Sequence, residues 1–140
     1  MNESPSPWYE KCKVSVSGGE SDLVDLPAKV KVRGNWTTSY EKKPLRINFT
    51  KKQSLLGLNG GREFRNWVLL AMHKDWSMLR DASALYIGKL ISPDYSSDFA
   101  FVEVYVNSEY WGVYLLCEQQ EVRKGRIEIT SPKKDYKNTD

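Results

Sequence analysis

The chain has 140 residues, of which 40% are hydrophobic and 28% are charged, and this composition supports one folded domain and excludes a disordered chain. Its net charge of +3 comes from 21 Lys and Arg against 18 Asp and Glu that are mixed along the sequence. Such mixing argues against a nucleic-acid partner, because nucleic-acid-binding proteins concentrate basic residues on one face. No apolar stretch approaches the ~20 residues of a membrane span, and no signal peptide is visible.

The first half of the chain predicts three strands after a flexible lead-in over residues 1–10. Residues 11–17, 28–33 and 43–49 alternate polar and apolar side chains, which is typical of strands with one buried face. Residues 21–27 are acidic and end in proline, so they predict a loop between the first two strands.

The second half predicts a helix between further strands. Residues 67–71 are continuously apolar and indicate a buried strand, with a helix as the competing interpretation. Residues 77–91 predict the principal helix, because apolar residues recur at helical spacing. The β-rich segments 99–106 and 110–117 predict a hairpin, and residues 126–129 predict a short last strand.

Together these elements predict an α+β fold, with an antiparallel sheet of about five or six strands and one principal helix inserted before the hairpin. Residues 11–130 are expected to form the domain, and residues 131–140 a polar basic tail. Two cysteines, Cys12 and Cys117, are too few for a disulfide scaffold, and with one histidine in the chain they give no zinc-binding pattern. The sequence leaves open whether these two cysteines pair.

Cationic residues gather where two predicted strands approach a turn. Arg33 ends one strand, and the next begins with Lys42, Lys43 and Arg46. On the sheet face opposite the apolar residues, these cations would line a groove for phosphate, with lysine as a point charge and arginine as a fork. A solvated sheet face is the alternative interpretation.

Two other candidate sites carry weaker patterns. His73 lies two residues before Asp75, which suggests part of a catalytic triad, although a structural or exposed histidine is the more ordinary interpretation. Glu103, Glu109 and Glu118 fall on or beside the predicted hairpin. Because nothing marks a cleft between paired carboxylates, as a glycosidase would need, we expect these three on the surface.

The most distinctive strings of the chain are KVRGNWTTSYEKKPLRINF (31–49), SLLGL (54–58), WVLLAMHKDWSMLRDASALYIGKLI (67–91), FVEVYVNSEYWGVYLLCEQ (101–119) and KGRIEI (124–129). In this order and at this spacing they resemble the spore-coat protein H (CotH) kinase family, an atypical group of protein-kinase-like proteins. The likeness covers roughly residues 28–130, and the combination is far more specific than any single string.

The resemblance implies the nucleotide-side portion, or N-terminal lobe, of a kinase that transfers a phosphoryl group from ATP to a protein. It implies that Lys43 (or Lys42) contacts the nucleotide phosphates. Arg46 and Arg33 would support the same phosphates. Glu118 would lie near the hinge or make a structural hydrogen bond.

ATP with Mg²⁺ or Mn²⁺ is the implied cofactor set, and the metal-holding and catalytic acids are expected in a second lobe beyond residue 140. The chain by itself is therefore expected to be inactive and to hold no catalytic or metal-binding residue. Implied partners are that second lobe and a protein substrate or a coat or surface protein, in the bacterial cell envelope, a secreted fraction or the spore coat. A lobe without its partner is also expected to expose an apolar patch.

The predicted helix departs from the kinase pattern. It contains no Glu, and Asp81 is its only acid, so Lys43 lacks the partner of the usual Lys–Glu ion pair. This favours the alternative of a non-catalytic surface or coat scaffold that keeps a kinase-like fold. A third alternative is a carbohydrate-binding surface. Trp67 is expected in the core, and the other tryptophans would serve as stacking platforms: Trp8, Trp36, Trp76 and Trp111.

Overall fold

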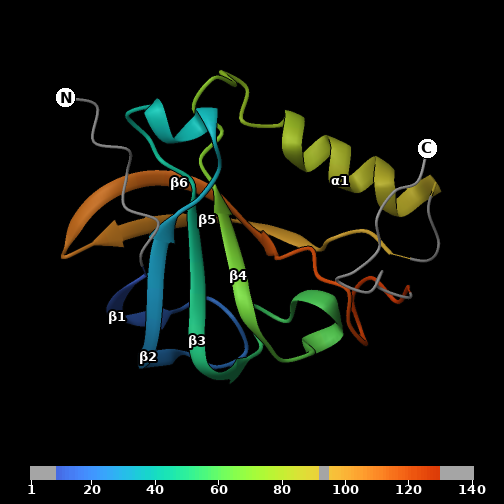
Figure 1. Cartoon of the computed structure of the whole chain (residues 1–140), viewed down its shortest axis with the longest axis horizontal. Coiled ribbons are helices and arrows are strands. Elements are labelled where there is room, and N and C mark those ends of the chain that lie inside the picture. The colour runs from blue at the N-terminus through green and yellow to red at the C-terminus, as the bar shows by residue number, and fades with distance from the viewer. Residues whose placement is uncertain (1–8, 92–94, 130–140) are drawn as a thin grey trace, which may run out of the picture.

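A computed structural model describes residues 9–91 and 95–129 (Figure 1). Over these residues the elements are β1 (Glu10–Val16), β2 (Leu23–Val32), the 3-10 helix η1 (Trp36–Ser39), β3 (Leu45–Gln53), the 3-10 helix η2 (Leu58–Gly61), β4 (Phe64–Leu70), α1 (Arg80–Ile91), β5 (Phe99–Val106) and β6 (Glu109–Glu118). The predicted α+β fold with one antiparallel sheet and one principal helix is confirmed. The predicted tail over 131–140 and nearly all of the predicted lead-in lie outside the described residues.

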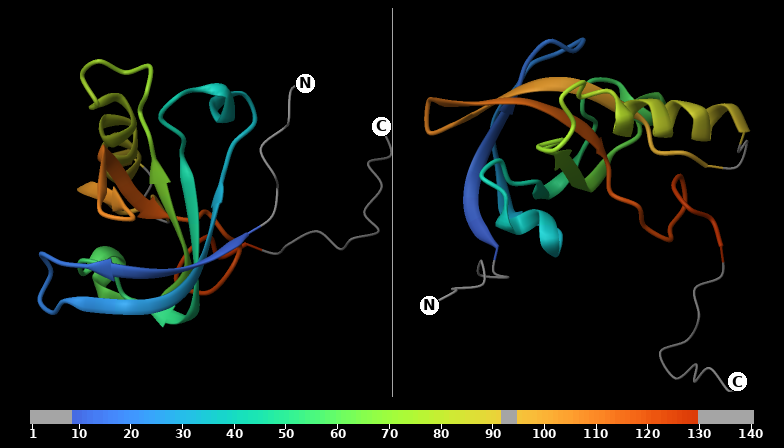
Figure 2. Two further views of the ribbon diagram at one scale, coloured as in Figure 1. Left: turned by 90° about the vertical axis from the view of Figure 1, so that its left-hand side faces the viewer. Right: turned by 90° about the horizontal axis from the view of Figure 1, so that it is seen from above.

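The strands form one sheet in the order β1-β2-β3-β4-β6-β5, and every neighbouring pair is antiparallel. The sheet is curled (Figure 2). The registers of β1–β2, β3–β4 and β5–β6 each contain a shift, and such bulges increase the local twist of a sheet. The apolar run at residues 67–71 is mostly strand β4, so the competing helix interpretation is wrong.

The two faces of the sheet bury different groups. Trp67, Phe49 and Tyr114 are fully buried on the face that carries the main core. Leu115 points to the opposite face, because successive side chains of a strand alternate between faces. There it packs with Ala82 of α1 in a smaller apolar cluster. The helix therefore covers only part of the second face, and the rest is left to polar residues.

The β5–β6 hairpin forms as the sequence predicts, and β5 has the predicted bounds. Asn107 and Ser108 connect the strands with φ of 49° and 67°. Two consecutive residues with positive φ are typical of the type I′ turn, whose twist matches that of the flanking strands. The position of the hairpin at the edge of the sheet brings the end of β6 beside β4.

Two sequence predictions are wrong. Residues 21–27 are not all loop, because β2 begins at Leu23 and continues through Pro27. A proline is tolerated there because β2 pairs with β3 only from Ala28 onward, so no ladder hydrogen bond to β3 is lost. Residues 126–129 form no strand, and this part of the chain makes only one isolated bridge.

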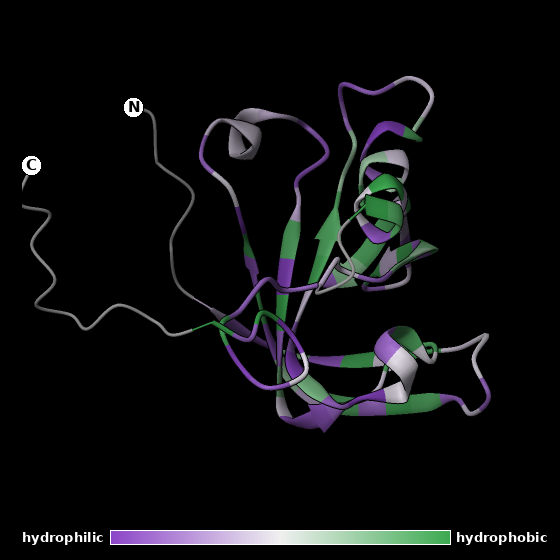
Figure 3. Ribbon diagram, turned by 90° about the vertical axis from the view of Figure 1, so that its right-hand side faces the viewer, coloured by the Kyte–Doolittle hydropathy of each residue, from purple (hydrophilic) through white to green (hydrophobic). Residues whose placement is uncertain are grey.

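Helix α1 begins at Arg80, three residues later than predicted, because Met78 has a φ of 56° and so cannot be helical. The Asp75 carboxylate accepts hydrogen bonds from the backbone N–H groups of Ser77 and Arg80, at 3.1 and 2.8 Å. Within the described residues no helix is both long and apolar enough to cross a membrane. Hydrophobic residues are frequent along α1 (Figure 3), and many of them are exposed, as an apolar patch requires. The large apolar residues exposed on and just before the helix are Met78, Leu79, Tyr86, Ile87, Leu90 and Ile91.

Candidate functional site

A cavity of about 240 Å³ lies between α1 and the part of the sheet beneath it. Val68 on β4 pairs in register with Cys117 on β6 and with Arg46 on β3, so these residues form one row across the sheet. Polar groups that converge over an apolar floor are typical of small-molecule sites. The cavity is lined by Arg33, Val68, Leu70, Asp81, Ala84, Leu85, Ser97, Cys117, Glu118, Gln119 and Gln120.

Arg33, Arg46 and Glu118 are brought into this one region. Arg33 and Glu118 line the cavity directly. Arg46 is half-buried beside it, and its Nε donates a hydrogen bond of 3.1 Å to Oε1 of the lining residue Gln119. Asp81 from α1 shares the cavity with Arg33, so the helix contributes an acid and the residue directly after β2 a cation to the same space.

Lys42 and Lys43 lie away from the cavity and are engaged by backbone carbonyls. The Lys43 ammonium donates to two carbonyl oxygens of the loop that carries η1, at 2.7 and 2.9 Å. The Lys42 ammonium donates to the Val113 carbonyl and lies 4.5 Å from the centre of the Tyr114 ring. Burial lowers the pKa of Lys42. The contact of either lysine with nucleotide phosphates stays a prediction.

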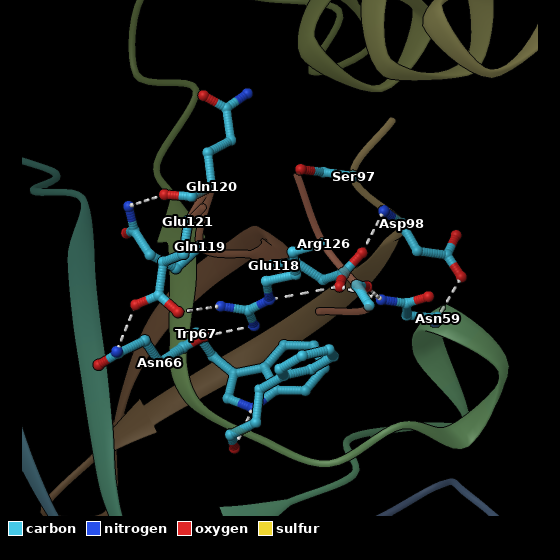
Figure 4. Close-up of polar contacts among 12 residues, drawn as sticks. Asn59, Asn66, Trp67, Ser97, Asp98, Glu118, Gln119, Gln120, Glu121 and Arg126 are labelled. Carbon is cyan, nitrogen blue, oxygen red and sulfur yellow. Dashed lines mark hydrogen bonds and ion pairs between the residues drawn. The ribbon is translucent and has the colours of Figure 1, made fainter. Parts of the chain in front are cut away.

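Glu118 is 2% exposed and belongs to a buried polar network (Figure 4). Its Oε1 accepts a hydrogen bond of 2.6 Å from Asn59 Nδ2, and its Oε2 accepts one of 2.9 Å from the Asp98 backbone N–H. The surface placement expected for this glutamate is therefore wrong, whereas Glu103 and Glu109 are exposed as expected. A buried carboxylate with this set of donors is held in one orientation at the edge of the cavity.

Arg126 is the centre of the network and is also 2% exposed. Its Nη1 donates to Glu121 at 3.0 Å and its Nη2 to the Asn66 carbonyl at 2.8 Å, while its Nε lies 3.6 Å from Glu118 Oε1 (Figure 4). The guanidinium also lies 3.9 Å from the centre of the Phe64 ring. Burial lowers the pKa of Arg126, and the negative charges of Glu121 and Glu118 oppose that shift. This one side chain therefore ties the segment after β6 to the sheet.

Asp98 extends the network toward α1. Its carboxylate accepts a hydrogen bond of 2.9 Å from the Asn59 backbone N–H and forms an ion pair with Lys89 of the helix. Burial raises the pKa of Asp98, but the hydrogen bonds from Lys89 and Asn59 outweigh burial and bring the pKa below its usual value. The network thus joins η2, α1 and the end of β6.

The sequence gives no signal for this network. Arg126 precedes Ile127 in a segment that alternates charged and apolar residues, a pattern that would place the arginine in solvent. Its partner Asn66 lies 60 positions earlier, and Asn59, which bonds Glu118, is equally remote, so no local spacing connects them. Only the paired strands bring these residues together.

Of the remaining candidates, Cys117 lines the cavity, whereas His73 and Cys12 do not. His73 is exposed and stacks on Tyr40, with 5.3 Å between ring centres. Cys12 and Cys117 are both free thiols, and burial raises the pKa of Cys117 to about 12. Among residues 9–91 and 95–129, no group of three His, Cys, Asp or Glu side chains is placed to hold a metal ion.

The family model described as CotH kinase protein matches residues 30–135. This chain belongs to the CotH kinase family. The resemblance that the sequence carries is therefore confirmed. No curated protein matches the chain. The matched part of this CotH-family chain contains the whole cavity and every member of the Arg126 network.

Proposed function

We propose that this CotH-family chain forms the nucleotide-side lobe of a kinase that transfers a phosphoryl group from ATP to a protein. The observation that carries the proposal is the meeting of Arg33, Arg46 and the acid of α1 around one cavity. A small antiparallel sheet with one helix inserted before its last hairpin is the architecture expected of a kinase N-terminal lobe. Membership of the CotH kinase family supports a kinase-like function.

In this proposal the cations contact the nucleotide phosphates and the network holds the surrounding chain. Arg33 and Arg46 present guanidinium groups, whose fork suits phosphate oxygens. Glu118 and Arg126 fix the start of the segment after β6, which would border the adenosine. Catalysis by a kinase depends mainly on positioning and on stabilising charge. A rigid backbone next to the cations therefore fits this role.

The proposal assigns the remaining chemistry to a second lobe. That lobe would supply the carboxylates that hold Mg²⁺ or Mn²⁺ and the residue that orients the protein hydroxyl. The exposed apolar surface of α1 would face it. The proposal places the substrate in the spore coat or elsewhere in the bacterial envelope, and the family name supports a spore-coat association.

Nucleotide binding tests this proposal. We would titrate ATP with Mg²⁺ into the chain by calorimetry and repeat the titration with Arg33→Gln/Arg46→Gln. Loss of two charge-assisted contacts should weaken binding by roughly tenfold or more. Lys13→Gln on the edge strand β1 is a matched control that should bind like the wild type. Equal ATP affinity in the arginine double variant would contradict the assignment.

A non-catalytic coat or surface scaffold is the second candidate function. The observation that favours it is the engagement of Lys42 and Lys43 by backbone carbonyls, which leaves neither ammonium directed at the cavity. The double variant Lys42→Ala/Lys43→Ala separates the candidates. Loss of ATP binding in that variant would support the kinase lobe with a lysine contact. If the wild type binds no ATP and the double variant only loses folding stability, the result would support the scaffold.

A further inference from the structure

A second cavity, of about 530 Å³, lies at the other end of β4 and carries an excess of positive charge. It is formed by the end of β3, the residues between η2 and β4, and the turn after β6. Four cationic side chains line it, against two acids, Glu63 and Glu128. The cations are Lys52, Arg62, Arg123 and Lys124.

The turn that presents two of these cations is rigidly built. The Arg126 backbone N–H donates to the Arg123 carbonyl at 3.1 Å, and Gly125 between them has φ of +83°, as a type II turn requires. Asn59 Nδ2 donates to the Gly125 carbonyl at 2.8 Å. Because the Arg126 side chain is buried in the polar network, the turn that carries Lys124 is fixed to the sheet.

The segment between η2 and β4, which carries Arg62, approaches this turn closely. A Cβ atom at Gly125 would lie 3.0 Å from Arg62 Nη1, so the Arg62 guanidinium rests closely against the backbone of the turn. The carboxylate of Glu128 accepts a hydrogen bond of 2.8 Å from the Gly125 N–H, and Arg123 is paired with Glu121 at 3.1 Å. Within the described residues, Arg62 forms no ion pair.

Lys52 and Lys124 likewise form no ion pair within the part of the chain that the structure describes. The cavity therefore holds three exposed cations that form no ion pair there, from the end of β3, the residues before β4 and the turn after β6. The cations of the lining outnumber its two acids, so the cavity attracts an anion.

We propose that this second cavity binds a phosphomonoester carried on an organic group, such as a phosphorylated serine. A phosphomonoester has a charge of about −1.5 to −2 at neutral pH, which matches the excess of two positive charges in the lining. The volume lies within the roughly 300–1,000 Å³ of ligand pockets and exceeds what a bare phosphate fills. Arg62 supplies a fork for two oxygens, and Lys52 and Lys124 supply point charges.

The site is separate from the cavity proposed for the nucleotide. Phe64 lines the second cavity and Val68 the first, and four residues of extended strand span ~13 Å. The buried contacts of Asn66 and Arg126 lie between them. The inference therefore does not depend on nucleotide binding.

The test is fluorescence anisotropy with the full chain and a labelled neutral peptide that contains one phosphoserine. The same peptide with serine or with glutamate in that place is the matched ligand control, and unlabelled phosphoserine and inorganic phosphate serve as competitors. The protein variants are Lys52→Gln/Lys124→Gln and the control Lys51→Gln, in which the neighbouring exposed residue of β3 outside the cavity lining is changed.

We expect the phosphopeptide to bind at least tenfold more tightly than the serine peptide. Each removed cation should weaken that binding by roughly tenfold, and Lys51→Gln should leave it unchanged. Free phosphoserine should compete better than inorganic phosphate. Saturating ATP, or the variant Arg33→Gln/Arg46→Gln, should not alter phosphopeptide binding.

Three results would overturn the proposal. The first is equal binding of the serine and phosphoserine peptides. The second is equal binding of the glutamate peptide, which would indicate a general carboxylate site. The third is an equal loss with Lys51→Gln, which would indicate only diffuse charge attraction. Failure of ATP binding with intact phosphopeptide binding would refute the nucleotide proposal alone.

Discussion

Replacing Arg126 with methionine should strongly destabilise the fold. The substitution keeps most of the aliphatic length of the side chain. It leaves the carboxylate of Glu118, a residue that is only 2% exposed, without its positive partner. It also removes the donors to Glu121 and to the Asn66 carbonyl. Removing one member of a buried ion pair costs about 3–5 kcal/mol, against a total stability of about 5–15 kcal/mol for a domain.

Urea unfolding followed by tryptophan fluorescence measures this loss, because Trp67 is fully buried and its ring lies 5.8 Å from the Arg126 guanidinium. Arg126→Lys keeps the charge but loses the forked contacts, so it should lose only about 1–3 kcal/mol. Arg123→Met is the matched control. Its side chain is 43% exposed in its ion pair with Glu121, and an exposed pair contributes about 0–1 kcal/mol.

A double-mutant cycle tests whether the partner charge is the cause. Glu118→Gln keeps an oxygen that can accept a hydrogen bond but removes the charge that Arg126 balances. The double variant Glu118→Gln/Arg126→Met should therefore be more stable than the sum of the two single losses predicts, by at least about 1 kcal/mol. An Arg126→Met chain within about 1 kcal/mol of the wild type, or strictly additive losses, would refute the reasoning.

Three further perturbations have defined outcomes. Asp98→Asn should reduce the free energy of unfolding at about pH 6, and the difference from the wild type should shrink toward about pH 3. A carboxylate with a lowered pKa stabilises the fold above about pH 4 and loses that effect as the pH falls through its folded pKa. A difference that stays constant over this pH range would contradict the reasoning. Gly34→Ala should cost about 1–3 kcal/mol in urea unfolding, because its φ is +98°; Gly19→Ala, whose φ is not positive, should stay within about 0.5 kcal/mol. Iodoacetamide at about pH 8 should modify Cys12 before Cys117, whose pKa is raised to about 12 by burial. Mass spectrometry of tryptic peptides measures the order of modification. Faster labelling of Cys117 would contradict this and would show that its strand opens.

The fold was largely predictable because its signals are local. Alternation within residues 11–17 and 43–49 predicts one buried face for each strand, and helical spacing predicts α1. The errors fall where local signals compete with pairing. Pro27 suggested a loop, yet β2 continues through it, because Pro27 pairs with Lys13 of β1 and lies outside the ladder with β3. Residues 126–129 alternate like a strand but make only one isolated bridge, between Ile127 and Val122.

The candidate site was predictable only in part. The spacing of cations placed Arg33 and Arg46 together. In the structure Arg33 lines the cavity, and Arg46 lies beside it, bonded to the lining residue Gln119. The sequence does not distinguish Arg46 from Lys42 and Lys43, because the three are near neighbours. Which of them lies beside the cavity depends on where β3 begins, and both lysines precede Leu45, its first residue.

The sequence by itself determined most of the strands, the helix and the family, because periodicity, turn residues and characteristic strings act over a few neighbouring positions. Only the tertiary structure decided that Glu118 and Arg126 are buried together, and that Lys52, Arg62 and Lys124 line one cavity. In both places the residues before and on β4 meet the residues after β6, which lie far away in the chain. Their proximity follows from the register and curl of the whole sheet, which no local pattern specifies.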